Sequence, residues 1–515
     1  MSGATAVGAA EQRTEEQPRP GRWLALGVLV LAVLLVGVDA TVLGLAAPYL
    51  SEDLRPSGTQ LLWIGDVYSF VIAGLLVSMG SLGDRIGRKK LLLTGSVAFG
   101  AMSALAAYAT TPEMMIAARA LQGVAGATLM PSTLALIRNL FHDPRERSLA
   151  VGVWGAAASA GTAVGPVLGG FLLGHFWWGS VFLINLPVMV VLVAVGIKVL
   201  PESRNPKPGP WDLASVGLSL VGMIGVVYAV KEAAAHGIGV GVVVAAVIGV
   251  LALVGFVRRQ LRLPTPLLDM KLFGNRGFSG AVLADLLTIL GLAGLLFFLS
   301  QFLQMVQGRS PLNAGLVELP AAVGAMGAGL AAGHVARRLS VRAVVSGGLV
   351  LVGLGLGACA WVSATTGTPV LGTILFVVGV GAGFSFTVTA DVILSSVPKE
   401  QAGAASAVSE TAYELGSALG IALLGSVVTG VYRNFTAPEG VPGEALGAAR
   451  ESLGGAVETA GDLPHRAGEA LLHAAQGAFT DGMETAAVVG GVISLSAAAA
   501  AWILLRGHRL DGGDA

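Results

Sequence analysis

Charged residues are scarce in this chain of 515 residues: Asp, Glu, Lys and Arg make up 12% of it, whereas a soluble domain carries about 25%. Such a chain cannot cover a water-exposed surface with charge, so its solvent is mostly lipid. The formal net charge is zero, and the basic footprint of a nucleic-acid-binding protein is therefore missing. The single cysteine, Cys359, excludes an intramolecular disulfide and a cysteine-based zinc site.

The sequence also lacks the short motifs of common enzymes. It contains no His-Glu-x-x-His pair and no Gly-x-x-x-x-Gly-Lys-Ser/Thr phosphate loop. Its 7 histidines are scattered and show no metal-ligand spacing. We therefore expect neither an enzyme nor an ATP-driven pump, and we expect no cofactor and no metal site.

Apolar residues and glycine are abundant instead: the chain is 54% hydrophobic and has 74 glycines. Small residues at this level are typical of closely packed membrane helices. Apolar runs long enough to span a bilayer, which takes about 20 residues, recur along the whole chain. They fall near 24–50, 61–82, 91–109, 114–137, 148–172, 179–200, 212–230, 239–257, 278–305, 313–335, 341–362, 370–395, 402–430 and 485–505. The pattern predicts an all-α, polytopic membrane protein with fourteen transmembrane helices, the first of which is retained rather than cleaved.

The distribution of Lys and Arg predicts the orientation of these helices. If the N-terminus is cytoplasmic, most basic residues lie in cytoplasmic segments and few lie outside, as the positive-inside rule requires. Both termini are then cytoplasmic, and the longest outer segment is 431–484. Residues 445–460 and 465–483 of that segment have weak helical periodicity, which fits either a short helical hairpin or a flexible loop.

The chain contains an internal repeat. Residues 333–342 (GHVARRLSVR) resemble a degraded copy of residues 80–90 (GSLGDRIGRKK) at the matching place in a second set of six helices. This predicts two six-helix bundles, 24–200 and 278–505, separated by two inserted helices in 212–257. Residues 1–23 and 506–515 are the cytoplasmic tails. Repeated halves are how transporters build a central site that opens alternately to either side.

Five short motifs stand out within or beside the apolar runs. They are Asp39 to Val42 with Ala46 to Pro48, Gly80 to Lys90, Arg119 to Gly123, Gly161 to Gly170, and the group Gln304, Gly308, Ser310, Pro311 and Gly315 to Pro320. Together they resemble the motifs of the fourteen-helix drug:proton antiporter family of the major facilitator superfamily, over nearly the whole chain. The resemblance implies an exporter, and it implies that Gly83, Asp84, Arg85, Gly87 and Arg88 stabilise one closed state.

Two of these motifs also have a direct physical interpretation. Gly161, Gly165 and Gly169 are spaced four apart and share one helix face that can meet another helix closely, while Pro166 can kink the helix. We expect this face, also part of the conformational switch, to lie where the two halves slide. Arg119 lies within a span, where a charge must face protein or water. It either anchors its helix through an ion pair or, as the resemblance implies, takes part in proton coupling.

Acidic residues inside the spans are functional candidates by default. They are Asp39, Asp66, Asp285, Glu318, Asp391, Glu410 and Glu414. At about 1.5 Å per residue, Asp39 and Asp66 lie toward the outer half of the membrane, whereas Glu410 and Glu414 lie nearer its middle and share a helix face. Asp391 also fits a second role, as a cap at a helix end near the cytoplasm.

Aromatic residues flank Asp66: Trp63 precedes it by three positions and Phe70 follows by four, so the three form a column along one helix face. A lipophilic cation would find charge and ring faces there, although Trp63 also fits an aromatic belt at the membrane boundary. This segment and 402–416 resemble the quaternary-ammonium and dye exporters of the family. The resemblance implies substrate contacts at Asp66, Trp63, Tyr68, Phe70, Glu410 and Tyr413, and proton coupling at Asp39, Arg119, Glu410 and Glu414.

These observations predict a multidrug exporter of lipophilic cations, driven by proton antiport, in a bacterial plasma membrane. Its partners are small cationic substrates, protons and lipid, and it works as a monomer without nucleic acid. Two alternatives remain: a proton-coupled exporter of an endogenous antibiotic or lipid, and a non-transporting membrane receptor or enzyme.

Overall fold

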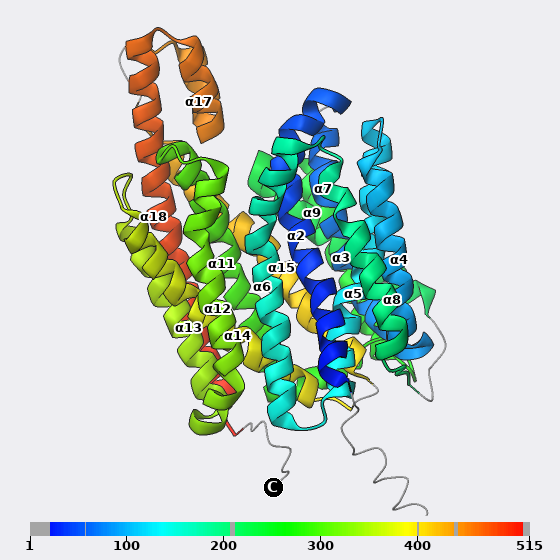
Figure 1. The fold of residues 1–515 in the computed structure, drawn as a ribbon. Helices are drawn as coiled ribbons and strands as arrows, with labels where there is room; N and C mark the ends of the chain where they lie inside the picture. Colours follow the sequence, from blue (N-terminus) through cyan, green and yellow to red (C-terminus); the bar gives the residue numbers. More distant parts are fainter. Residues whose placement is uncertain (1–20, 57, 206–211, 399–400, 437–440, 508–515) are drawn as a thin grey trace, which may run out of the picture.

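The computed structural model describes residues 21–56, 58–205, 212–398, 401–436 and 441–507, and in these ranges the chain is helical without strands (Figure 1). Within them are 14 helices long and apolar enough to cross a membrane. The all-α, fourteen-helix prediction is therefore confirmed. The two tails of the sequence prediction, 1–23 and 506–515, fall largely outside the described residues.

The first six spans form one bundle, which we call the N-terminal half. Neighbouring helices pack in the pairs α2–α6, α3–α5, α4–α5 and α4–α8. The sixth span is broken at Ile184 into a short and a long piece. The helices are α2 (Arg22–Leu54), α3 (Gly58–Ile86), α4 (Arg88–Ala107), α5 (Pro112–Leu140), α6 (Pro144–His175), α7 (Ser180–Leu183) and α8 (Asn185–Val199).

The last six spans form the C-terminal half, in which α11 packs on α15 and α18, and α14 packs on α12 and α13. A short 3-10 helix, η1 (Met270–Gly274), leads into it, and the π-helical turn η2 and the 3-10 turn η3 extend two of its helices. Its elements are α11 (Arg276–Gln301), η2 (Phe302–Val306), α12 (Pro311–Leu339), α13 (Val341–Ala358), η3 (Cys359–Trp361), α14 (Thr368–Ser395), α15 (Ala402–Tyr432) and α18 (His465–Leu504).

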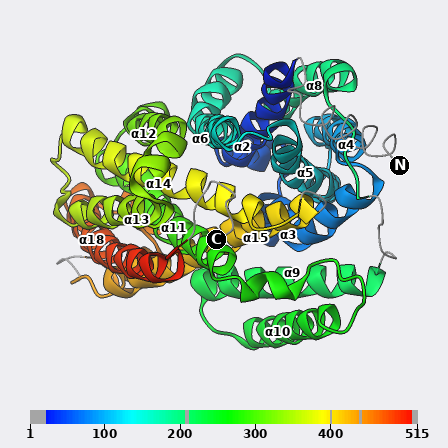
Figure 2. The ribbon, with the colours of Figure 1, turned by 90° about the horizontal axis from the view of Figure 1, so that it is seen from below.

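Two helices, α9 (Leu213–His236) and α10 (Val240–Gln260), stand between the halves in sequence and lie at one side of the molecule (Figure 2). Helix α9 contacts α3 of the N-terminal half and α15 of the C-terminal half. Helix α10 packs on α9 and leaves a face of exposed apolar side chains, among them Val247 and Leu251. An apolar face of this kind suits contact with lipid chains.

The segment between α15 and the last span is a helical hairpin, so this alternative of the sequence prediction is correct and the flexible loop is not. Helix α16 (Gly443–Glu451) is followed by α17 (Leu453–Asp462), which packs against the start of α18. At about 1.5 Å per residue the 40 residues of α18 exceed the thickness of a bilayer, so its first part projects beyond the bundle (Figure 1). We call this end of the molecule the hairpin end and the opposite end, which carries residues 83–90, the loop end.

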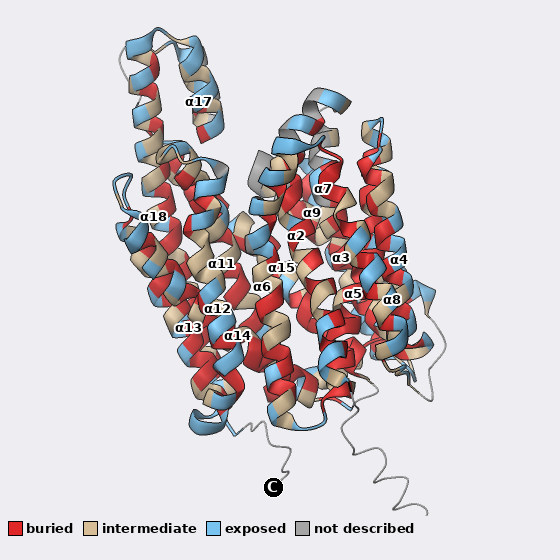
Figure 3. Ribbon diagram, viewed as in Figure 1, coloured by how far each residue is buried: buried red, intermediate tan, exposed pale blue. Residues whose placement is uncertain are grey.

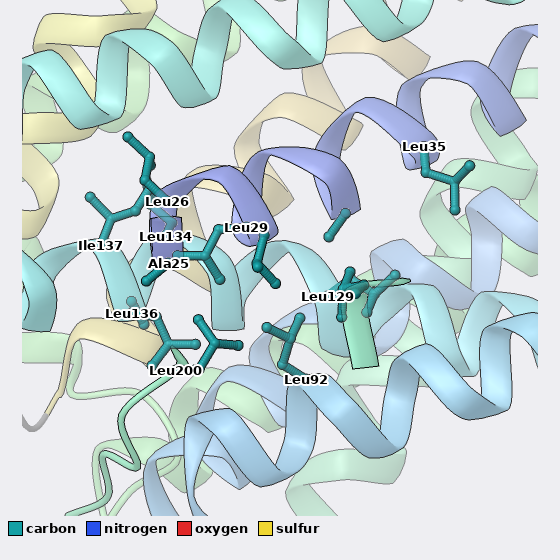
Figure 4. Packing of buried hydrophobic residues seen from close by; sticks show 14 of the residues in the cluster. Ala25, Leu26, Leu29, Leu35, Leu92, Leu129, Leu134, Leu136, Ile137 and Leu200 are labelled. Carbon is teal, nitrogen blue, oxygen red and sulfur yellow. The ribbon is translucent and has the colours of Figure 1, made fainter. Parts of the chain in front are cut away.

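Helix starts are specified by local sequence. Thr111, Asp143 and Ser310 accept hydrogen bonds from backbone N–H groups of the first turns of α5, α6 and α12, and each is followed by a proline at the first helical position. Most of the buried residues between the helices are apolar, while exposed residues line the outer faces (Figure 3). Near the loop end, Leu26 and Leu29 of α2 pack with Leu92 of α4 and Leu129 of α5 (Figure 4).

The two halves approach each other closely at the loop end. A side chain added at Gly80 of α3 would collide with the carbonyl of Gly403 of α15, and one added at Gly152 of α6 would collide with that of Gly329 of α12. Glycine at these positions lets the backbones of the two halves touch. Four glycines thus bring together the helices that carry the polar residues described next.

Candidate transport site and conformational contacts

A buried ion pair lies in the N-terminal half between Asp39 of α2 and Arg119 of α5. Arg119 Nη1 donates to Asp39 Oδ2 at 2.9 Å, and both side chains are 2% exposed. The guanidinium also lies 4.4 Å from the ring centroid of Tyr68 of α3. The structure therefore brings together three residues that the sequence analysis placed in two separate roles.

Three further polar side chains complete this cluster. Gln122 Nε2 and Asn185 Nδ2 each donate to Asp39 Oδ1 at 3.0 Å, and both amides also donate to the Ser103 hydroxyl. Gln122, Asn185 and Ser103 are fully buried. The carboxylate of Asp39 thus accepts hydrogen bonds from three donors, one of them charged.

The loop motif joins the halves through Asp84 at the end of α3. Its Oδ1 accepts bonds from Arg88 Nε at 2.8 Å and Nη2 at 2.6 Å. The same carboxylate accepts the backbone N–H groups of Gly403 and Ala404 at 3.2 Å, which lie at the start of α15. A carboxylate at a helix N-terminus accepts hydrogen bonds from the free N–H groups of the first turn and interacts favourably with the helix dipole. Asp84 therefore connects its own half to the other.

Glycine is needed at two positions of this motif for different structural reasons. Gly87 has φ of 112° and lies beside the Glu202 carboxylate, which accepts the backbone N–H groups of Lys89 and Lys90 at 3.2 Å. An L-residue there would be strained and would collide with Glu202. A side chain at Gly83 would press on Leu91 at 3.2 Å. Arg85 is half-buried in the same turn.

The glycine face of α6 packs within the N-terminal half. Added side chains at Gly161 and Gly165 would collide with Leu34 and Thr41 of α2, and one at Gly169 would lie 3.1 Å from Leu45. The expectation that this face lies between the sliding halves was wrong, because its partner is α2 and not a helix of the C-terminal half. The face instead positions the helix that carries Asp39. The side chain of Pro166 lies outside the described residues.

The two carboxylates of α15 lie where the halves meet, because α15 contacts α3 and α5 as well as α11, α14 and α18. Glu410 is 7% exposed, and the charges of Glu414 and Asp285 act on it. Glu414 also acts electrostatically on Tyr68 of the N-terminal half. Tyr413 is 42% exposed and lies beside Phe386 of α14, with ring centroids 5.9 Å apart.

Trp63 and Phe70 of α3 contact each other edge to face, with ring centroids 6.0 Å apart, and Trp63 stacks on Tyr228 of the inserted helix α9. Phe70 is buried with Val227 of α9 and Ala418 of α15. Trp63 and Phe70, the two aromatic members of the predicted column, are therefore in contact, whereas Tyr68 lies against Arg119. The side chain of Asp66 lies outside the described residues.

Sequence reasoning missed several polar partners. Gln122 follows Arg119 by three positions, which places both on one helix face, so the spacing could have revealed it. Asn185 was visible as a lone amide within an apolar run. Arg147 of α6 pairs with Asp391 of α14 at 2.6 Å, so Asp391 joins the halves rather than capping a helix end. Glu318 of α12 is half-buried, and its Oε1 has no partner among the described residues.

A fourteen-span bundle of two six-helix halves and two inserted helices, with buried carboxylates where the halves meet, is the architecture of a membrane transport protein. The model of the Major Facilitator Superfamily matches residues 29–421, and the chain belongs to this superfamily. It is therefore a multi-pass membrane transporter and not an enzyme.

Relatives with known roles extend over nearly the whole chain. The multidrug efflux pump LfrA of Mycolicibacterium smegmatis is 48% identical over 94% of this chain and 96% of its own length. The methyl viologen resistance protein SmvA of Salmonella typhimurium is 37% identical over 94% and 98%. The tetracenomycin C resistance and export protein of Streptomyces glaucescens is 32% identical over 93% and 91%. Among solved structures, the human organic anion transporter MFSD10 covers 95% of this chain with all of its own, at a TM-score of 0.63 and 15% identity, which shows the shared fold.

Proposed function

We propose that this protein exports lipophilic cations from the cytoplasm in exchange for protons. The observation that carries the proposal is the place of Glu410 and Glu414 on α15, the helix that contacts both halves. A carboxylate there can hold a proton or attract a cation, and it cannot easily do both. Similarity to a multidrug efflux pump and to a methyl viologen resistance protein supports the export of drugs.

In this proposal the cation binds beside the aromatic side chains of α3. Asp66 supplies charge, Trp63 and Phe70 supply ring faces, and Tyr413 and Glu410 contact the cation from α15. Tyr68 connects this region to the ion pair, because its ring lies on Arg119 and is within electrostatic range of Glu414. Glu410 and Glu414 exchange the proton, while Asp39 and Arg119 respond to it through their ion pair.

Direction follows from the orientation that we propose for the bundle. The loop end and both termini face the cytoplasm, and the hairpin end faces outward, consistent with the basic residues near 85–90. Cation entry from the cytoplasm favours loss of the proton, and protonation from outside favours release of the cation. Asp84, with Arg88, holds the loop end closed, and the glycine face of α6 keeps α2 in place as the halves move. The transporter acts as a monomer in the plasma membrane.

A second candidate is export of a compound made by the same cell, such as an antibiotic or a lipid. Its specific support is the 32% identity to the tetracenomycin C resistance and export protein. The two candidates share the fold and the coupling residues, and they differ only in the substrate.

A transport assay in inverted membrane vesicles tests the proposal. Uptake of ethidium, of a quaternary ammonium compound and of a neutral drug is compared with and without an imposed pH gradient. We expect both cations to accumulate only when the vesicle interior is acidic, and the neutral drug to accumulate far less. Uptake that ignores the gradient contradicts proton antiport, and a preference for the neutral drug contradicts cation selectivity.

A further inference from the structure

Asp285 of α11 is a buried carboxylate to which the proposed mechanism gives no role. It is 3% exposed and lies where α11, α14 and α15 meet. The hydroxyl of Thr389 of α14 donates to its Oδ1, and the hydroxyl of Ser409 of α15 donates to its Oδ2 at 2.9 Å. Asp285 thus joins three helices of the C-terminal half through hydroxyl groups.

The other buried aspartates of this protein are paired with arginine. Asp39 binds Arg119, Asp84 binds Arg88 and Asp391 binds Arg147. No basic side chain is identified against Asp285 in the described ranges, although six elements pack around α11. Helix α13 has only Arg342, which lies on the Trp502 ring, α14 has only Asp391, and the charged residues of α18 all precede Thr485. Lys271 of η1 is exposed, η2 has no charged residue, and α15 brings Glu410 and Glu414.

This difference in partners decides which aspartate can exchange a proton. A guanidinium only donates, so Arg119 cannot accept a hydrogen bond from a protonated acid. A hydroxyl both donates and accepts, so Ser409 and Thr389 can stabilise a charged Asp285 or, after rotating, accept a bond from the protonated acid. The same three side chains therefore accommodate both protonation states without moving a helix.

Asp285 also lies next to the carboxylate to which the proposed function assigns the proton. Ser409 directly precedes Glu410 in α15, and the charge of Asp285 acts on Glu410. Both lie about 12–13 Å from the loop-end starts of their helices, since Asp285 is the tenth residue of α11 and Glu410 the ninth of α15. In a buried site, two interacting carboxylates disfavour a second negative charge unless a cation is nearby.

We propose that Asp285 is a second proton-carrying residue and shares one proton with Glu410; this inference rests on the proton antiport proposed above. With the site empty, the pair holds one proton and one negative charge. Arrival of a cation beside Glu410 makes the second negative charge favourable, so the pair releases its proton to solution. Departure of the cation restores the repulsion, and the pair takes up a proton again. One cation is exchanged for one proton, and charge balances at each step.

The test uses the full-length protein in detergent and tetraphenylphosphonium as the probe. Its affinity is measured from pH 5 to pH 9, and proton release on binding is followed with a pH indicator. For wild type we expect about one proton released per cation and a tenfold gain in affinity per pH unit below a midpoint. Asp285→Asn removes the like charge beside Glu410, so we expect the midpoint to move down by at least one pH unit. Ser409→Ala removes a donor to the ionised Asp285, whereas the protonated acid can still donate to Thr389, so we expect the midpoint to move up.

The opposite signs separate proton sharing from a structural role, because a loosened helix contact has no reason to move the midpoint in two directions. Asp285→Glu should restore proton release toward the wild-type value, and Asp481→Asn, at an exposed carboxylate of α18, is the matched control. If Asp285→Asn does not fold, the sign of the Ser409→Ala shift still decides. Wild-type midpoints in both variants overturn the role of Asp285 while leaving antiport intact. Absence of proton release and of pH-dependent affinity in wild type overturns both proposals.

Discussion

Arg147 of α6 and Asp391 of α14 form an ion pair between the two halves, with Arg147 Nε and Asp391 Oδ1 2.6 Å apart. The two side chains are 7% and 0% exposed. Near them, Arg138 of α5 donates to the carbonyl of Val397 just beyond α14. The loop end is thus held by contacts on both sides of the molecule: α3 with α15 through Asp84, and α6 with α14 through Arg147.

Loss of the Arg147–Asp391 pair should open the loop end. Asp391→Asn leaves a buried guanidinium without its counter-charge, which costs several kcal/mol in the closed state. We expect Ser148→Cys, placed where α6 meets Gly333 of α12 in a Cys359→Ser background, to react with N-ethylmaleimide at least tenfold faster in the Asp391→Asn variant.

Asp212→Asn is the matched control for that experiment, because Asp212 also pairs with an arginine and lies within the inserted helices instead of between the halves. Equal reactivity of Ser148→Cys with and without the Asp391→Asn change would mean that the pair does not hold the halves together.

Close packing of α6 on α2 should be required for transport. A methyl group at Gly165 collides with Thr41 and lies 3.2 Å from the Val38 carbonyl, whereas one at Gly170 meets open space. We expect Gly165→Ala to lower ethidium efflux at least tenfold, since overpacking costs about 1–3 kcal/mol. Gly170→Ala should leave efflux unchanged, and adding Thr41→Ala to Gly165→Ala should restore part of it. Normal efflux from the Gly165→Ala variant would show that α2 and α6 can move apart at this site at little cost in free energy.

The orientation of the bundle can be tested by labelling. Ser452 at the start of α17 and Arg204 after α8 are both exposed and lie at the hairpin end and the loop end. In a Cys359→Ser background we expect an impermeant maleimide to label Ser452→Cys in intact cells and Arg204→Cys only in inverted vesicles. The reverse pattern would turn the topology over.

Different substitutions should impair substrate recognition and proton exchange separately. Asp66→Asn keeps the shape of the side chain and removes its charge, so we expect export of ethidium to fall far more than export of a neutral drug. Glu414→Gln should abolish gradient-driven export of both and leave binding of tetraphenylphosphonium within about threefold of wild type. If Asp66→Asn alone stops proton release while Glu410→Gln and Glu414→Gln release protons normally, the roles are exchanged.

The inserted helices should lose stability in acid. Hydrogen bonds from Arg259 and Ser215 hold the pKa of Asp212 well below its usual range. A lowered pKa stabilises the folded state above the unfolded pKa of about 3.9, and this contribution is lost as pH falls through the folded pKa. We expect Asp212→Asn to lower the Tm of the detergent-purified protein by a few degrees at pH 7, with the difference from wild type beginning to shrink below about pH 4 and shrinking further as the pH falls. If the Tm difference between Asp212→Asn and wild type is the same at all pH values, the ionised carboxylate is not its cause.

The sequence predicted the number and type of the helices because each span is a long apolar run, a signal that is local along the chain. It also located Asp39, Arg119 and Glu410, because a charge inside such a run is conspicuous. It did not show which charges meet. The Arg147–Asp391 pair joins residues that lie 244 positions apart, and no local pattern encodes their approach.

The wrong expectation has a similar origin. The spacing of Gly161, Gly165 and Gly169 correctly indicates a face for close contact, since the spacing follows from the helical repeat. The identity of the partner helix depends on how six helices arrange around one another. That arrangement placed α2, and with it Asp39, against this face.

The Asp84 carboxylate binds both Arg88 and the N-terminus of α15, and this determines the free energy needed to open the loop end. When α15 withdraws, Asp84 loses the N–H groups of Gly403 and Ala404 but keeps Arg88, so its charge is never left bare. The cost is then two hydrogen bonds to a charged group, about 3–6 kcal/mol in all. Because one cation leaves for each proton that enters, the membrane potential does no net work, and a gradient of one pH unit supplies about 1.4 kcal/mol per cycle. Closure at this position is therefore stronger than the free energy that one proton supplies, so the gate holds at rest and its opening has to be offset by contacts made elsewhere in the cycle.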